Sequence, residues 1–108
     1  MNELLDRRSL ETFICEASEA FPKCAGGVLV DRHGFVISSN IKTREFDENE
    51  LALQAISDRK IVDVKNYIPV VKDVDDNNRL MLLVERDKRN LSSYRKLYQV
   101  IRERNPFI

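Results

Sequence analysis

The sequence predicts one α/β domain of the α+β type: a central, largely antiparallel five-stranded sheet flanked by three helices. Its 108 residues are the length of a single domain, and 43% of them are apolar, enough for one core. Apolar residues recur at helical spacing in three segments, and short β-rich runs joined by turn residues lie between these segments. We therefore expect residues 1–108 to form one domain with the order α-β-β-α-β-β-β-α.

The first helix is predicted by a single apolar stripe. Asn2 or Ser9 can cap its N-terminus, and Pro22 marks its end. The residues of the stripe lie three and four positions apart, as one face of a helix requires. They are Leu10, Phe13, Ile14, Ala17, Ala20 and Phe21.

A β-hairpin is expected next. Two β-rich runs, residues 25–30 and 35–39, flank a turn at residues 31–34, and Gly34 suits the left-handed backbone position that closes such a turn. The apolar residues in both runs are continuous and do not alternate with polar ones, which predicts that both strands are covered on both faces. Two glycines near the start of the first run indicate close packing or a bulge.

A second helix follows a polar connection. Asp47 and Glu50, three residues apart, have the form of a capping box. The apolar residues behind them cover more of the helix surface than a stripe facing one core requires. Some of these residues are therefore candidates for a dimer or partner surface, with burial in the core as the equal alternative. The candidates are Leu51, Leu53, Ala55 and Ile56.

Three extended segments come between this helix and the last one. They are residues 61–64, 67–74 and 80–86, and we expect each of them to be a strand. Pro69 places the middle segment at an edge of the sheet or at a strand end. The third segment is continuous and apolar, which is typical of a central strand.

The last helix carries most of the uneven charge. Asn90 caps it and Pro106 stops it. The chain has 18 basic and 18 acidic residues, but residues 86–108 hold seven cations against two anions. This excess indicates either a solvated outer face or a basic patch for an acidic partner or phosphates. Nucleic acid is the less favoured partner, because Tyr94 and Tyr98 lie on the apolar stripe and so face the core. The candidates for a basic patch are Arg95, Lys96 and Arg102.

The side-chain groups that catalysis needs are not assembled in this sequence. His33 is the single histidine and lies in the hairpin turn, where polar residues occur for conformational reasons. Neither a metal-ligand spacing nor a phosphate-binding loop occurs. Cys15 and Cys24 are too few for a disulfide framework, which favours reduced thiols in the cytoplasm. No apolar run reaches the ~18 residues that span a bilayer. The sequence therefore predicts a cytoplasmic, non-enzymatic protein without cofactor, metal or membrane insertion.

Two segments resemble a known family. They are residues 27–39, which follow an amphipathic helix, and residues 80–86, which lead through Asn90 and Leu91 into the last helix. Together with the order of elements, they resemble the roadblock/LC7 family, whose domains place a five-stranded antiparallel sheet between one helix on one face and two on the other. The resemblance implies a homodimer, or a heterodimer with a related domain, that regulates or scaffolds a small GTPase or a multiprotein complex. It implies no catalytic residues.

Weaker resemblances point to other classes of protein. The strand, turn and strand of residues 25–39 also resemble sensors of the PAS type, so a PAS- or GAF-like small-ligand sensor is the alternative function. The hairpin with residues 48–56 behind it is similar to the opening of a cytidine-deaminase-type domain. That enzyme needs a zinc-binding histidine here and cysteines downstream, and both are missing. The likeness therefore implies a non-catalytic relative.

Overall fold

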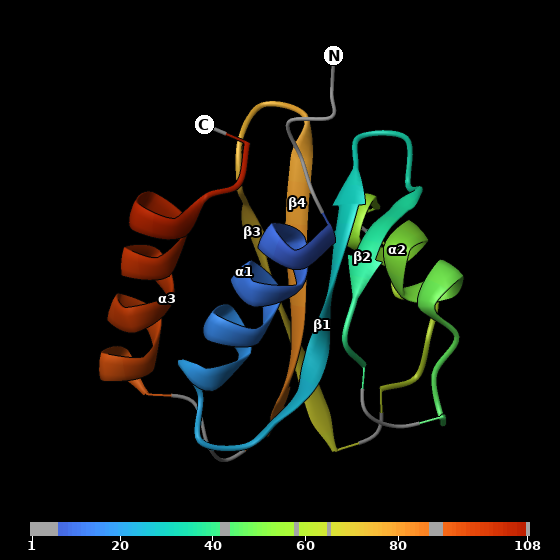
Figure 1. The fold of residues 1–108 in the computed structure, drawn as a ribbon. Helices are drawn as coiled ribbons and strands as arrows, with labels where there is room; N and C mark the ends of the chain where they lie inside the picture. Colours follow the sequence, from blue (N-terminus) through green and yellow to red (C-terminus); the bar gives the residue numbers. More distant parts are fainter. Residues whose placement is uncertain (1–6, 42–43, 58, 65, 87–89, 108) are drawn as a thin grey trace.

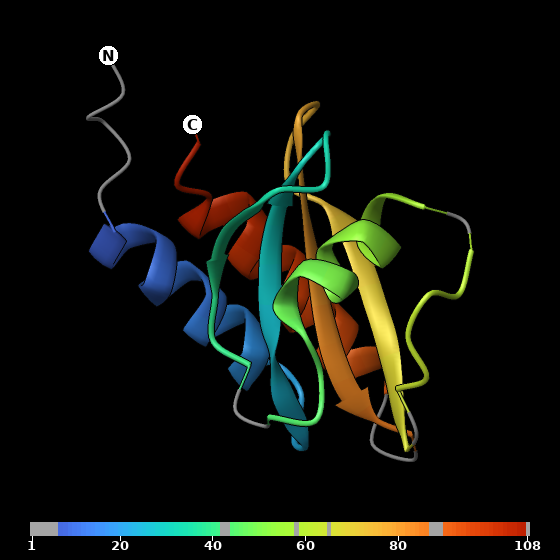
Figure 2. The same ribbon diagram turned by 90° about the vertical axis from the view of Figure 1, so that its right-hand side faces the viewer.

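The fold has three layers, with a sheet between helices on both faces. The computed structural model describes residues 7–41, 44–57, 59–64, 66–86 and 90–107. In chain order the elements are α1 (Arg7–Glu19), β1 (Cys24–Asp31), β2 (Val36–Ser39), α2 (Glu48–Ile56), β3 (Tyr67–Asp73), β4 (Asn78–Glu85) and α3 (Leu91–Arg104). Helices α1 and α3 lie side by side on one face of the sheet, and α2 covers the other (Figures 1 and 2).

The sheet has the strand order β2-β1-β4-β3, and each neighbouring pair is antiparallel. The two central strands, β1 and β4, are buried along almost their whole length, so the prediction from their continuous apolar runs is confirmed. For the run at residues 35–39 the same prediction is wrong. Strand β2 is an edge strand with half-buried residues, and Phe35 just before it is 68% exposed. Strand β3 forms the other edge, as Pro69 predicted.

The predicted fifth strand is not present in the described residues. Residues 59–64, which we call the connector, carry no strand, so the sheet has four strands in place of the expected five. The reason lies in α2, where the side-chain Oε1 of Gln54 accepts hydrogen bonds from the backbone N–H groups of Ile61 (2.9 Å) and Val62 (2.6 Å). The Gln54 side chain thus accepts hydrogen bonds from the backbone N–H groups that a strand would donate to a neighbouring strand.

Two apolar clusters fill the spaces between the layers. Alternate residues of β1 and β4 point to opposite faces, which is how one sheet serves both clusters. The cluster under α1 and α3 includes Phe13, Ile14, Leu29, Leu82 and Leu97. The cluster under α2 includes Val28, Val30, Leu51, Met81 and Leu83. Full burial of each such side chain stabilises the fold by about 1.5–3 kcal/mol.

Local sequence signals set most of the element boundaries. The predicted caps are confirmed, since Asp47 accepts a hydrogen bond from the N–H of Asn49 and Asn90 accepts one from the N–H of Ser93. Helix α1 ends before Pro22, as expected. Of its two predicted starts, Asn2 lies outside the described residues and Ser9 lies within the helix.

The glycines of the first hairpin occupy positions where a side chain would not fit. Gly26 has a φ of 121° at a break in register, and a Cβ on Gly27 would lie only 2.7 Å from Leu82 Cδ2, which agrees with the prediction of close packing or a bulge. Gly34 closes the turn with a φ of 88°. Tight, glycine-dependent packing around β1 therefore holds the chain after β2, strand β4 and helix α2 close to β1 and its turn.

Candidate interaction surfaces

Helix α2 divides the four candidate residues into two pairs. Leu51 and Ala55 are buried against the sheet, so they belong to the core of this domain. Leu53 is 47% exposed, and Ile56 is half-buried at the end of the helix. Only the second pair can contact a partner without unfolding the domain.

The exposed pair lies against the turn of the first hairpin, and the residue after Gly34 in this turn is apolar and exposed. Gly34 lies against α2 so closely that a Cβ on it would be 2.9 Å from Ile56 Cδ1 and 3.1 Å from Leu53 Cδ2. The next residue, Phe35, is the most exposed large apolar side chain in the described part of the chain. We call Phe35, Leu53 and Ile56 the hairpin patch. Sequence reasoning missed Phe35 because its apolar run indicated a covered strand.

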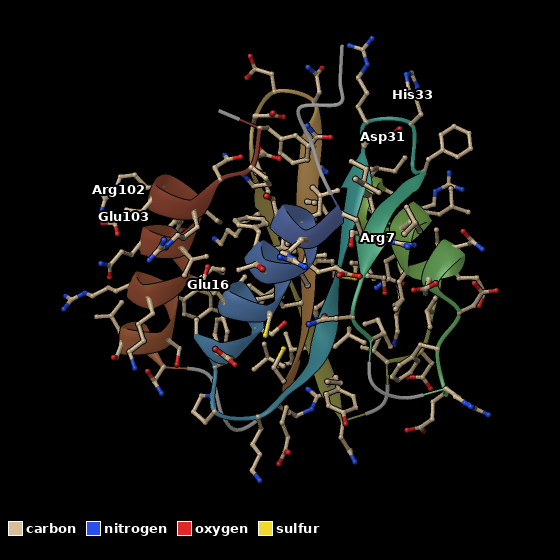
Figure 3. The ribbon with its side chains drawn as sticks, in the orientation of Figure 1. Arg7, Glu16, Asp31, His33, Arg102 and Glu103 are labelled. Atoms are coloured by element: carbon tan, nitrogen blue, oxygen red, sulfur yellow. The ribbon has the colours of Figure 1, made fainter. Side chains whose placement is uncertain are left out.

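Asp31 holds the turn that carries Phe35. Its Oδ1 accepts hydrogen bonds from the N–H groups of His33 (2.8 Å) and Phe35 (3.0 Å). The Phe35 N–H is the main cause of a lowered pKa of Asp31, and the N–H and the charge of His33 lower this pKa further. Asp31 and His33 lie at the tip of the hairpin, and His33 is exposed to solvent (Figure 3). The backbone N–H of His33 therefore helps to hold the turn. Among the described residues, no three or more metal-ligating side chains come together.

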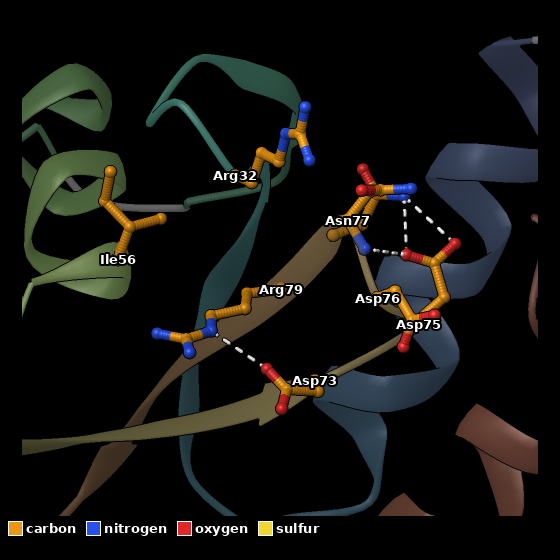
Figure 4. Close-up of a pocket in the computed structure, with 8 residues that line it drawn as sticks. Arg32, Ile56, Asp73, Asp75, Asp76, Asn77 and Arg79 are labelled. Atoms are coloured by element: carbon orange, nitrogen blue, oxygen red, sulfur yellow. Dashed lines mark hydrogen bonds and ion pairs between the residues drawn. The ribbon is translucent and has the colours of Figure 1, made fainter.

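A charged pocket of about 440 Å³ lies near this turn, bounded by the β3–β4 turn and the end of α2 (Figure 4). Two of its charged groups, Arg79 and Asp73, form an ion pair with each other. Arg79 Nε is 2.8 Å from Asp73 Oδ1, and Arg79 Nη1 donates to the carbonyl oxygen of Ala55. Asp75 accepts from the Asn77 N–H and the Asn78 side chain, which orders the turn. The contacts of Arg79 thus tie β3 and β4 to α2.

A second hollow, of about 530 Å³, opens between the connector, α2 and β3, and we call it the connector groove. Tyr67, Pro69, Val71 and Met81 make much of its surface apolar. Three cations also line it, two from the connector and one that directly follows β4: Arg59, Lys60 and Arg86. Sequence reasoning did not find this site, because its walls come from four separate segments, α2, the connector, β3 and β4, and none of them has a motif of its own.

The candidate basic residues on α3 are all exposed. Arg95 and Arg102 are seven residues apart, about two helical turns, so they share one face, whereas Lys96 lies about a quarter turn away. Arg102 and its neighbour Glu103 lie on the outer side of α3 (Figure 3). This placement fits a solvated outer face better than a focused patch.

The two tyrosines of α3 have different surroundings. Tyr94 packs edge-to-face on Phe21 with ring centroids 5.3 Å apart, as predicted for a residue facing the core. Tyr98 was expected to face the core too, but it is half exposed. Its hydroxyl accepts a hydrogen bond from Lys72 Nζ (2.8 Å), and this ammonium lies 5.0 Å from its ring centroid. Lys72 on β3 thus holds the hydroxyl end of Tyr98.

The fold has a known counterpart among solved structures. No protein-family model matches the chain, and no curated protein is significantly similar to it in sequence. The crystal structure of a Roadblock/LC7 domain from Streptomyces avermitilis superimposes with a TM-score of 0.65 over 89% of this chain and 94% of that one, at 14% identity. None of the helices in the described part of the chain is both long and apolar enough to cross a bilayer. The chain has the fold of a Roadblock/LC7 domain, as the resemblance of its sequence predicted.

Proposed function

We propose that this domain is a non-enzymatic protein-interaction module that forms a homodimer through the hairpin patch. The dimer would act in the cytoplasm as a platform that regulates or scaffolds a small GTPase or a multiprotein complex. The observation that carries the proposal is the exposure of two apolar side chains near one turn: Leu53 lies against Gly34, and Phe35 is the next residue in the chain. The likeness to a Roadblock/LC7 domain supports it, since the fold suggests a module for domain–domain interaction.

A two-fold symmetric contact would bury the hairpin patch of both copies. In a symmetric dimer the same surface of both copies is buried, so each exposed side chain counts twice. Phe35 and Leu53 are each about half exposed or more. Burying what remains of them in both copies contributes about 3–6 kcal/mol, taking roughly half of the full burial value for each of four side chains. Association itself costs several kcal/mol, so the patch can support a dimer only with further contacts around it.

Sedimentation equilibrium over a concentration series tests this proposal. The wild type is expected to sediment as a dimer and Leu53→Arg as a monomer, because the substitution buries an unpaired guanidinium in both halves of the contact. Leu91→Arg is the matched control. Leu91 is 67% exposed on α3, on the opposite face of the sheet from α2, so this variant should remain a dimer.

Two results would contradict the proposal. One is a wild type that stays monomeric at the highest concentration, and the other is equal dissociation of both arginine variants. A strictly monomeric protein that co-purifies with a small organic ligand would favour the PAS- or GAF-like sensor.

A further inference from the structure

The connector groove is separate from the hairpin patch and has a different character. Leu53 and Ile56 flank the hairpin side of α2, whereas Gln54 points from the opposite flank toward the connector. The patch is apolar, while the groove combines an apolar surface with cations. A partner in the groove would therefore leave the proposed dimer contact free.

The walls of the groove are held in place by the fold. Gln54 is buried, and its Oε1 fastens the connector to α2 through the two backbone N–H groups at Ile61 and Val62. Val64 at the end of the connector is buried and accepts a hydrogen bond from the N–H of Tyr67 (3.0 Å). A preformed groove costs little ordering entropy when a ligand binds.

The backbone at the edge of β3 is suited to a short contact and not to a long added strand. The N–H of Tyr67 points away from β4, because it bonds to Val64. Alternate residues of an antiparallel strand direct their backbone groups to the same side. The backbone groups of Pro69 and Val71 therefore also point away from β4. Pro69 has no N–H to donate, which interrupts the row of donors that a new strand would use. Side chains must therefore supply most of the binding.

The charges of the groove have one sign. Arg59, Lys60 and Arg86 line it, and no carboxylate is among the described residues that do so. Lys60 lies 4.0 Å from Asp63, but both side chains are more than 70% exposed, so this pair is weak. A ligand that places carboxylates by these cations and apolar side chains on Tyr67, Pro69 and Val71 would match both properties of the surface.

We infer that the connector groove binds a short extended segment of a partner protein in which apolar side chains alternate with carboxylates. In an extended segment such side chains point to opposite sides, so apolar ones can enter the groove while carboxylates reach its cationic rim. The inference rests on the proposed role in protein binding, but not on self-association through the hairpin patch.

Fluorescence anisotropy with labelled synthetic peptides tests the inference on the full chain. One peptide alternates leucine with glutamate, and the second alternates leucine with lysine. We expect the wild type to bind the glutamate peptide at least about tenfold more tightly, with an affinity that falls as salt is added. The double variant Arg59→Glu/Lys60→Glu should reverse this preference. The matched control is Arg95→Glu/Lys96→Glu, which makes the same change of net charge on α3 and should keep the preference of the wild type.

The outcomes separate this inference from the proposed dimer. Equal binding of the two peptides, or equal loss in the groove variant and the α3 control, would overturn the inference. It would also be overturned if neither peptide bound and the groove variant instead changed the oligomeric state, because a second copy would then occupy the groove. If the wild type is monomeric yet prefers the glutamate peptide in the predicted way, the groove assignment holds and only the dimer fails.

Discussion

Gln54 provides a direct test of how the connector is held. Its buried Oε1 is the acceptor for two backbone donors, at 2.9 Å for Ile61 and 2.6 Å for Val62. Gln54→Ala removes this oxygen and leaves two partly buried N–H groups without their acceptor. Each such bond contributes about 0.5–1.5 kcal/mol, so the free energy of unfolding should fall by about 1–3 kcal/mol.

Urea denaturation followed by circular dichroism measures this loss, and amide hydrogen exchange locates it. The amides of Ile61 and Val62 should lose more protection than those of β1, because the connector opens before the sheet does. Gln54→Glu keeps an acceptor oxygen and should lose less stability than Gln54→Ala. Gln99→Ala on the exposed face of α3 removes only a 3.5 Å contact to Glu103 and should change stability by less than about 0.5 kcal/mol.

The reasoning is refuted if Gln54→Ala is as stable as Gln99→Ala. It is equally refuted if stability falls while the exchange of the two connector amides stays unchanged. In that case the loss would arise within α2, and the connector would be held by other contacts.

Two further predictions concern the first hairpin. Gly26→Ala should lower the free energy of unfolding by about 2–5 kcal/mol, as measured by urea denaturation. The reason is that φ at Gly26 is 121° and a Cβ there would collide with the carbonyl of Asn40. A variant with the same free energy of unfolding as the wild type would contradict this prediction. The pKa of Asp31 lies below its ordinary value of 3.8 in the folded protein, so its stabilising effect is present above that value and is lost as the pH falls through the lower folded pKa. Nuclear magnetic resonance should show the amide signals of His33 and Phe35 moving together in that acid range, and Asp31→Asn should remove this titration.

Much of the fold could be predicted because its determinants are local. The caps at Asp47 and Asn90 bond to backbone groups two or three residues away, and Gly34 closes its own turn. The continuous apolar runs of β1 and β4 indicated central strands, and the structure places them there. In each of these places the physical cause lies within a few residues of its effect.

The errors occur where distant segments decide the outcome. An apolar run such as Phe35–Ile37 can belong to a covered strand or to an edge strand, and only its position beside β1 shows that it is an edge. Residues 61–64 have the composition of a strand, but Gln54 captures two of their donors. The connector groove was not predicted for the same reason, since α2, the connector, β3 and β4 form it only when they are packed together.

Sequence alone determined the helices, the central strands and the turns, because these depend on periodicity, caps and residue chemistry. It also showed that α2 is apolar around much of its surface. Which of those residues remain exposed was decided by the tertiary structure, which buries Leu51 and Ala55 against the sheet and leaves Leu53 exposed beside Gly34. The physical reason is that a helix with apolar residues on several sides can bury only the side that meets the sheet, and that choice depends on how the whole chain packs.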